Sequence, residues 1–308
     1  MSVENIRQWQ IGDVRISRIV EVASYPADIG MLLAGAESSI LDPHRDWLSP
    51  HFITPDGQIL MQWQAFAIQT SDRTIMIDTC IGNDRKLHFE VFNDMQTDFL
   101  QDLESIGIDT NAVDTVCCTH LHYDHVGWNT RWDGSQFVPT FPNARYLFDR
   151  TEYAEMQQLA RDGDWHALHV PDAINPIVAA GLHEFISAPG YQICDELWMH
   201  HTPGHTAGHC AIQIQSRGER AVITGDLLHH PIQFAIPERH GNFDHDPATA
   251  AATRVQFVAD HANQPIMVIG SHFNDPTAGW IVPEGAAWRF VTERPKSRHP
   301  KSSDGDTQ

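Results

Sequence analysis

The feature that most constrains how this chain can fold is a dense run of ligand-type side chains at residues 119–125, Thr-His-Leu-His-Tyr-Asp-His. Three imidazoles and one carboxylate occupy six consecutive positions of this run. Zinc and similar divalent ions prefer such groups, and two ions need more ligands than one loop supplies. The run therefore predicts a metal centre to which the fold brings further ligands from distant segments.

Three later segments offer the missing ligands: Thr202–His209, Thr224–Asp226 and Gly270–His272. Each is a short turn after an apolar, strand-like run, so each would place a ligand at the end of a strand. We expect three histidines to hold one ion, an aspartate and two histidines to hold a second, and Asp226 to lie between the ions. The two expected groups are His120, His122 and His205, and Asp124, His125 and His272.

The four motifs His-x-His-x-Asp-His, Gly-His-Thr-x-Gly-His, Gly-Asp and Gly-x-His resemble, in this order, those of the metallo-β-lactamase superfamily. The resemblance extends from Gln64 to Phe273 and is greatest for the lactonase and methyl parathion hydrolase branch. It implies an α/β fold, the four-layer αββα sandwich, and a binuclear site with a bridging aspartate. The family's ligand roles carry over to seven residues: His120, His122, Asp124, His125, His205, Asp226 and His272.

Departures from related branches narrow the family. Flavodiiron proteins have Glu at the second position of the first motif, where this chain has His122, so a redox di-iron site is not expected. Asp226 stands where the antibiotic-hydrolysing branches have Cys or a different ligand set. In acyl-homoserine lactonases a tyrosine three residues after the bridging Asp helps to polarise the substrate carbonyl. This chain has His229 there, which makes His229 a candidate for the same role.

Two divalent ions would generate a metal-bridging hydroxide from water at neutral pH. Zinc is the expected metal, although the ligands also accept manganese, iron or cobalt. This chemistry predicts hydrolysis of a small, mostly apolar lactone or carboxylic ester, with Asp124 passing a proton to the leaving oxygen. The alternatives are organophosphate triester hydrolysis, thioester hydrolysis of the glyoxalase II type and a non-catalytic metal-binding role. Asp78 either accepts the second N–H of a ligating His or is a plain turn residue. His209 and His230 are expected to be structural or to contact the ligands.

Composition bounds the partners and the compartment. The net charge of −20 argues against nucleic acid, because proteins that bind it neutralise phosphates with Lys and Arg. The sequence shows no apolar run of about 18 residues and no signal-peptide pattern. The five cysteines form no paired spacing, which is typical of a reducing compartment. We therefore expect a cytoplasmic protein that acts on a small molecule, without a membrane as partner.

Alternating apolar and turn-forming segments predict strands interspersed with helices. Strands are expected at 14–20, 64–69, 74–78, 113–118, 146–148, 197–200, 211–215, 221–224 and 266–269, the last clear one. Helices are expected at 98–104, with Thr97 as N-cap, at 152–161 and near 173–181. Asp246-Pro247 predicts the start of a helix to about Ala262, because Asp caps free N–H groups and Pro loses no bond at the first helical position.

One catalytic domain is expected over residues 1–292, followed by a flexible tail at 293–308 that has almost no apolar residues. Within the domain, segment 24–60 is expected to be a long loop with several large apolar side chains. Long ordered loops often form lids or binding loops, so Trp47 and Phe52 are candidate anchors for a substrate. The alternatives are that this segment caps a sheet or forms the contact of a homodimer.

Overall fold

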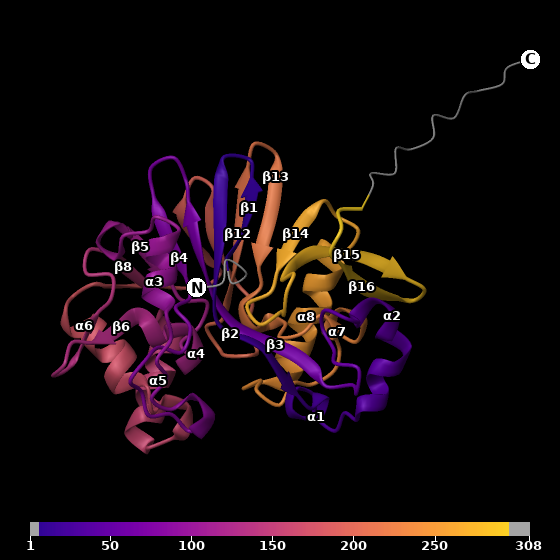
Figure 1. The fold of residues 1–308 in the computed structure, drawn as a ribbon, viewed down its shortest axis with the longest axis horizontal. Coiled ribbons are helices and arrows are strands. Elements are labelled where there is room, and N and C mark those ends of the chain that lie inside the picture. The colour runs from indigo at the N-terminus through magenta and orange to yellow at the C-terminus, as the bar shows by residue number, and fades with distance from the viewer. Residues whose placement is uncertain (1–5, 296–308) are drawn as a thin grey trace, which may run out of the picture.

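Two seven-stranded sheets form the centre of the computed structural model, which describes residues 6–295 (Figure 1). The first sheet has the order β1-β2-β3-β4-β5-β8-β9, with β1 (Ile6–Ile11), β2 (Val14–Ala27), β3 (Ile59–Gln69), β4 (Thr74–Ile77), β5 (Thr115–Cys117), β8 (Arg145–Asp149) and β9 (His183–Ile186). The second sheet consists of consecutive strands, β10 (Gly190–Cys194), β11 (Leu197–His201), β12 (Cys210–Ser216), β13 (Glu219–Ile223), β14 (Ile266–Ile269), β15 (Ala278–Glu284) and β16 (Ala287–Val291). A small hairpin, β6 (Thr130–Trp132) and β7 (Phe137–Pro139), stands apart.

The sheets pack face to face because apolar side chains alternate along their strands. In β2, Ile16 belongs to the core between the two sheets, whereas Ile19 belongs to the core under the helices of the first sheet. These two positions point to opposite faces of a strand. From the second sheet, Ile212 and Ile214 meet Ile16 in the central core. Full burial of such a side chain stabilises the fold by about 1.5–3 kcal/mol.

Helices cover both outer faces of the pair of sheets. The first sheet packs against α3 (Phe99–Ser105), α5 (Arg150–Asp162) and α6 (Asn175–Ala179). The second packs against α7 (Ile232–Ala235) and α8 (Pro247–His261), together with α1 (Ile29–Leu32) and α2 (Arg45–Leu48). The predicted start of α8 is confirmed, since the Asp246 side chain accepts a hydrogen bond from the Thr249 N–H. The predicted four-layer αββα arrangement is also confirmed.

Several sequence-based assignments were wrong. The strand expected at 14–20 extends to Ala27 as β2, and the strand expected at 64–69 begins already at Ile59 as β3. Both are longer than expected because they pair with each other, through an irregular register, as far as Ala27 and Ile59. Segment 24–60 is therefore two strand ends and three short helical segments rather than one loop. Asp98, not Thr97, occupies the N-cap of α3. A further hairpin, β15 and β16, follows the strand expected to be the last.

Within residues 6–295 no helix is long and apolar enough to cross a membrane. All five cysteines are free thiols, and Cys117 and Cys118 are buried in apolar surroundings beside the first ligand loop, as small fillers. Of the predicted tail, residues 296–308 lie outside the described part of the chain.

Candidate metal centre

All seven predicted ligands lie in turns or short helices that follow strands, and the fold brings all seven together. β5 leads into the loop that ends in α4 (Tyr123–Val126) and carries four of them. His205 lies in the turn between β11 and β12, Asp226 in the helical turn after β13, and His272 in the turn after β14. Ligands from both sheets therefore meet at one end of the sandwich.

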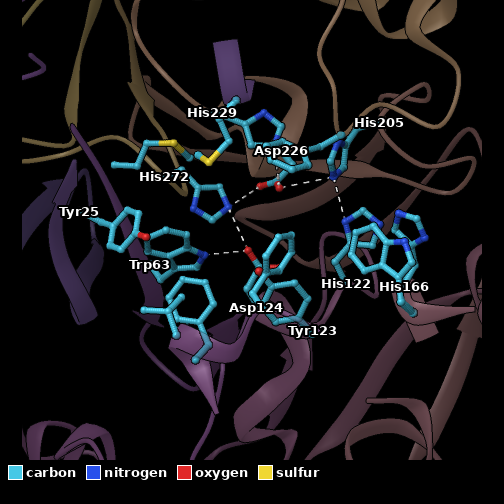
Figure 2. Close-up of a pocket in the computed structure, with 17 residues that line it drawn as sticks. Tyr25, Trp63, His122, Tyr123, Asp124, His166, His205, Asp226, His229 and His272 are labelled. Carbon is cyan, nitrogen blue, oxygen red and sulfur yellow. Dashed lines mark hydrogen bonds and ion pairs between the residues drawn. The ribbon is translucent and has the colours of Figure 1, made fainter. Parts of the chain in front are cut away.

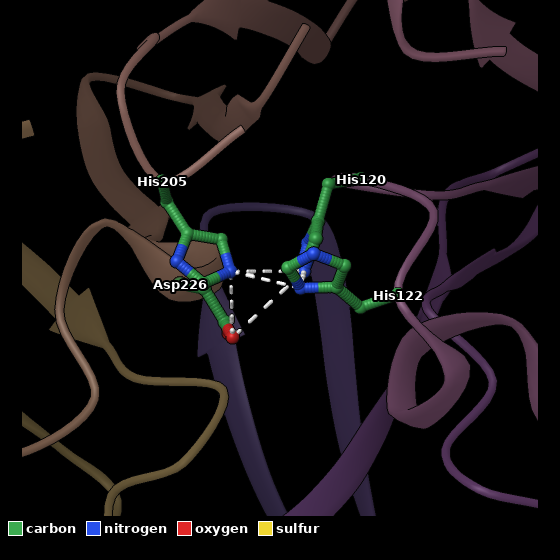
Figure 3. A group of neighbouring side chains, drawn as sticks. All are labelled: His120, His122, His205 and Asp226. Carbon is green, nitrogen blue, oxygen red and sulfur yellow. Dashed lines mark hydrogen bonds and ion pairs between the residues drawn. The ribbon is translucent and has the colours of Figure 1, made fainter. Parts of the chain in front are cut away.

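Three imidazoles and one carboxylate converge in the first group, His120, His122, His205 and Asp226 (Figure 3). The Nε2 atom of His120 lies 2.9 Å from His122 Nδ1 and 3.2 Å from His205 Nε2. The remaining pair, His122 Nδ1 and His205 Nε2, is 3.1 Å apart. Nitrogens on a tetrahedral zinc ion lie roughly 3.3 Å apart, because a Zn–N bond is about 2.0–2.1 Å long. This group therefore fits a divalent metal ion.

The second group is Asp124, His125 and His272. The Nε2 atoms of its two histidines are 3.3 Å apart, and Asp124 Oδ2 lies 3.6 Å from His272 Nε2. Asp226 reaches both groups, because its Oδ1 lies 3.1 Å from each Nε2 atom of the second group and its Oδ2 lies 3.4 Å from His205 Nε2. An aspartate in this position can bridge two ions.

The charge states of the ligands suit metal binding. Burial and the neighbouring imidazoles lower the pKa of His120 and of His122 well below its ordinary value, so both rings are neutral and offer lone pairs. At His125, burial acts in the same direction, but the carboxylates of Asp226 and Asp78 outweigh it and raise the pKa well above its ordinary value. A proton and a metal ion therefore compete for the Nε2 atom of His125.

Two ligating rings are oriented through their other nitrogen. The Nδ1 atom of His125 donates to Asp78 Oδ2 at 2.8 Å, which is the contact that a ligand-supporting Asp78 requires. Asp78 also accepts from the Thr119 N–H at 2.7 Å and adopts a left-handed φ of 55°. His272 donates through Nδ1 to the Gln62 carbonyl at 3.0 Å. Such partners fix the tautomer and leave Nε2 directed at the metal position.

Sequence reasoning missed the residues behind His205. Its Nδ1 lies 3.4 Å from Asp244 Oδ1, and Asp244 Oδ2 accepts from the Arg254 guanidinium at 3.2 Å. Both partners are fully buried side chains. Burial opposes the charge of Asp244, but His205 and Arg254 outweigh it and lower the pKa. One sequence signal for a buried Arg254 was available. This residue lies four positions after Ala250 and three before Phe257, on the apolar stripe of α8, where a charged side chain needs a buried partner.

Of the other candidate histidines, two contact Asp226 and one does not. His229 Nε2 is 3.1 Å from Asp226 Oδ2, and the His229 ring stacks on His272 with centroids 5.5 Å apart. The buried Nδ1 of His229 has no hydrogen-bond partner among residues 6–295. His209 supports the bridging residue from behind, because its Nε2 accepts from the Asp226 N–H at 2.9 Å. His230 donates to a backbone carbonyl at 2.7 Å and contacts no predicted ligand.

A cavity of about 130 Å³ opens onto the two groups (Figure 2). Away from the His and Asp side chains its walls are mostly aromatic, and most of these aromatic residues come from segments that no motif marks. They include Trp63, Phe89, Phe92, Tyr123, Trp165 and Phe243. From segment 24–60, Tyr25 and Met31 line the cavity. The expected anchors Trp47 and Phe52 do not, because both pack in the apolar core around α7 and β16.

Comparison with known proteins identifies the class. The family model of the metallo-beta-lactamase superfamily matches residues 62–263, well over half of the chain. The chain therefore belongs to the metallo-β-lactamase superfamily. It is a hydrolase of this superfamily whose clustered His and Asp side chains could hold metal ions.

Individual relatives are distant in sequence and close in fold. The N-acyl homoserine lactonase AiiA of Bacillus thuringiensis subsp. kurstaki is 20% identical over 245 residues, which cover 75% of this chain and 90% of that protein. The solved structure of the hydrolase AbOPH superimposes with a TM-score of 0.76 at 23% identity, covering 96% of this chain and 100% of the other. AidC, a dizinc quorum-quenching lactonase solved with its product, gives 0.74 at 18% identity, with 96% and 99% covered.

Proposed function

We propose that this hydrolase holds two divalent metal ions, with zinc as the favoured metal, and cleaves a small, mostly apolar lactone or carboxylic ester. The observation that carries the proposal is the position of the aromatic cavity, whose polar end is formed by Asp124, Asp226 and His272. Apolar walls of this kind bind an acyl or aryl group, and a few polar groups at one end fix the reacting bond. The lactonase AiiA, which matches 75% of the chain, supports the same substrate class.

In the proposed chemistry, the seven ligands form the two metal sites. Two bound cations supply an activated water and polarise the ester oxygen. Asp226 lies between the two groups and keeps them at a fixed separation, one carboxylate oxygen directed to each. Asp124 has a second proposed role. Its Oδ2 accepts from Trp63 Nε1 at 2.9 Å, and we assign to its Oδ1 the transfer of a proton from the attacking water to the leaving oxygen.

His229 is proposed as the residue that contacts the substrate oxygen. It lines the cavity, and burial lowers the pKa of its ring, so it is neutral. The Nδ1 atom is buried, so donation to a substrate oxygen would use Nε2, the nitrogen that faces Asp226. If Nε2 instead donates to Asp226 Oδ2, 3.1 Å away, His229 orients this ligand and does not contact the substrate. The two roles predict different results when His229 is replaced.

The proposed function is tested by assaying the metal-loaded enzyme on matched panels of lactones, aryl esters, phosphotriesters and glutathione thioesters. We expect kcat/KM to be highest for lactones or carboxylic esters and to rise with acyl length until the cavity is filled. The highest kcat/KM for phosphotriesters would favour the second candidate, whose aryl groups also suit the aromatic walls. Absence of turnover on every panel, with both ions bound, would favour a metal-binding role without catalysis.

The compartment is proposed from the thiols. All five cysteines are free, and burial raises the pKa of Cys118 and of Cys210 well above the ordinary value of a thiol, so both are protonated and unreactive. Proteins with free cysteines and no disulfides are typical of reducing compartments, which supports a location in the cytoplasm.

A further inference from the structure

Glu152 is a buried carboxylate that ligates no metal in the proposed site but contacts both loops of the first group. It lies in the first turn of α5, and its side chain is fully buried. Its Oε1 accepts from the Leu121 N–H at 3.2 Å, and its Oε2 accepts from the Gly208 N–H at 3.1 Å. Leu121 stands between the two histidines of the first motif, and Gly208 belongs to the turn that carries His205. One carboxylate thus joins segments that follow strands of different sheets.

At Gly208 the turn approaches α5 so closely that a side chain would fit only if the turn or the helix shifted. A Cβ atom at this position would lie 2.4 Å from Asp149 Oδ1 and 2.9 Å from Glu152 Cβ. Asp149 caps α5 by accepting from the N–H groups of Thr151 and Glu152, so the start of this helix is well fixed. The turn with His205 therefore rests directly on the first turn of α5.

Burying the charge of Glu152 is unfavourable, and groups of the two ligand loops compensate it. Among residues 6–295, no cationic side chain forms an ion pair with Glu152. Burial raises the pKa of Glu152, and the Thr206 side chain and the N–H groups of Leu121 and Gly208 oppose that shift. An unpaired buried charge is unfavourable unless hydrogen bonds compensate it. Here the compensating groups belong to the two ligand loops, so the loops and the carboxylate stabilise each other.

We propose that Glu152 is a positioning residue for the first metal group: it holds the loop of His120 and His122 at a fixed distance from the turn of His205. Neither sheet alone determines this distance, because the loop follows β5 of the first sheet and the turn joins β11 to β12 of the second. The role rests on the proposed metal centre and goes beyond it, since it assigns a function to a residue outside both groups.

The test compares two equivalent substitutions. Glu152→Gln keeps the size of the side chain but replaces one acceptor oxygen by an NH2 group, which would face an N–H donor. The control, Glu21→Gln, makes the same change at a carboxylate that accepts from the Ile81 N–H and from Trp128 Nε1, both at 2.7 Å, and touches neither ligand loop. Both are made in a His272→Ala background, where the remaining ion reports the first group. Zinc affinity is measured by chelator competition, and stability by the Tm of the metal-free protein.

We expect Glu152→Gln to weaken zinc binding about 10–100-fold, the range typical of residues that orient metal ligands, while the control lowers Tm and leaves affinity unchanged. Gly208→Ala, which pushes the turn away from α5 without removing a charge, should weaken binding in the same direction. Unchanged affinity in Glu152→Gln and Gly208→Ala, or an equal loss in the control, overturns the proposal. A parent protein that binds no zinc in this assay contradicts the metal centre itself.

Discussion

At the scale of single residues, Trp63 links the wall of the cavity to a metal ligand. Its indole N–H donates to Asp124 Oδ2 at 2.9 Å, as the dashed line in Figure 2 marks. Its ring packs against Phe92 and Tyr25, with centroids 4.9 and 5.5 Å away. A substrate that contacts this ring therefore also contacts the residue that orients Asp124.

Trp63→Phe removes the N–H donor and keeps most of the aromatic wall. Because Asp124 loses the partner that orients its carboxylate, we expect the affinity for one of the two ions to fall about 10–100-fold. Phe92→Leu is the control, since it changes the same wall without touching Asp124. Metal titration of both variants is the measurement. Full two-ion affinity in Trp63→Phe would reduce Trp63 to a wall residue.

His229→Ala separates the two roles of this ring. If His229 donates to the substrate oxygen, turnover falls about 10–1000-fold, as for the loss of one donor to a developing oxyanion, and metal content stays the same. If it orients Asp226 instead, metal is lost together with activity. Turnover and metal content are therefore measured on the same preparation. A fully metallated variant with unchanged turnover assigns neither role to His229.

The sequence predicts the residues of this site unevenly. The seven candidate ligands could be proposed because they stand in short motifs with a fixed order and because metals demand particular side chains. Asp244 and Arg254 were not among them: a charged residue on the apolar stripe of α8 indicates a buried partner, but not that this partner lies behind His205. The aromatic walls were missed for the same reason: Phe89 and Trp165 come from segments far apart in the chain, and aromatic residues are common in cores.

At the scale of elements, the segment between β2 and β3 has two parts with different surroundings. Met31, in α1, lines the mouth of the cavity and is 40% exposed. Phe52 is fully buried and packs edge-on against Phe290 and His230, with centroids 5.9 and 6.2 Å away. The first part can contact substrate, whereas the second part anchors the segment to the second sheet.

Met31→Ala should change the order of preference across the ester and lactone panel and leave stability nearly unchanged, because an exposed side chain contributes little to folding. Phe52→Ala should lower the free energy of unfolding by about 3–5 kcal/mol through the cavity that it leaves. Neither variant should alter metal content. Substrate profiles and denaturant unfolding are compared for both. A profile of Met31→Ala identical to that of the parent would exclude this part of the segment from substrate binding.

Elements with strong local signals could be predicted closely from the sequence. The expected strand at 266–269 is β14, and the expected helix from Asp246-Pro247 is α8, because the cap and the proline fix its start. Strands β15 and β16 were missed, since they have mixed burial and Pro283 and Gly285 lie near their turn. The extensions of β2 and β3 were missed because they result from pairing between distant residues.

At the scale of the whole molecule, buried neutral histidines make stability depend on pH. Burial lowers the pKa of His169 and of His230 to about 4, and each donates a 2.7 Å hydrogen bond to a backbone carbonyl. An unfolded histidine titrates near pH 6.5. Between about pH 6.5 and pH 4 the unfolded chain therefore binds protons that the native protein excludes, and stability falls as pH falls.

Because of each of these histidines, the free energy of unfolding should fall by about 2 kcal/mol when the pH is lowered from 7 to 5. Urea unfolding of the metal-free protein at the two pH values measures the total. In His230→Gln the loss should be smaller by about 2 kcal/mol, because one of the titrating groups is gone. An equal pH dependence in the variant and the parent would mean that His230 titrates normally in the native state.

The central claim is that two sheets bring seven ligands together for two metal ions, and metal content per chain tests it most directly. Elemental analysis of the reconstituted protein should give close to two divalent ions per chain. His272→Ala should chiefly lose one, and Asp226→Ala should lose both, because Asp226 reaches both groups. A content that never exceeds one ion per chain, even after reconstitution with excess metal, would contradict the two-metal account.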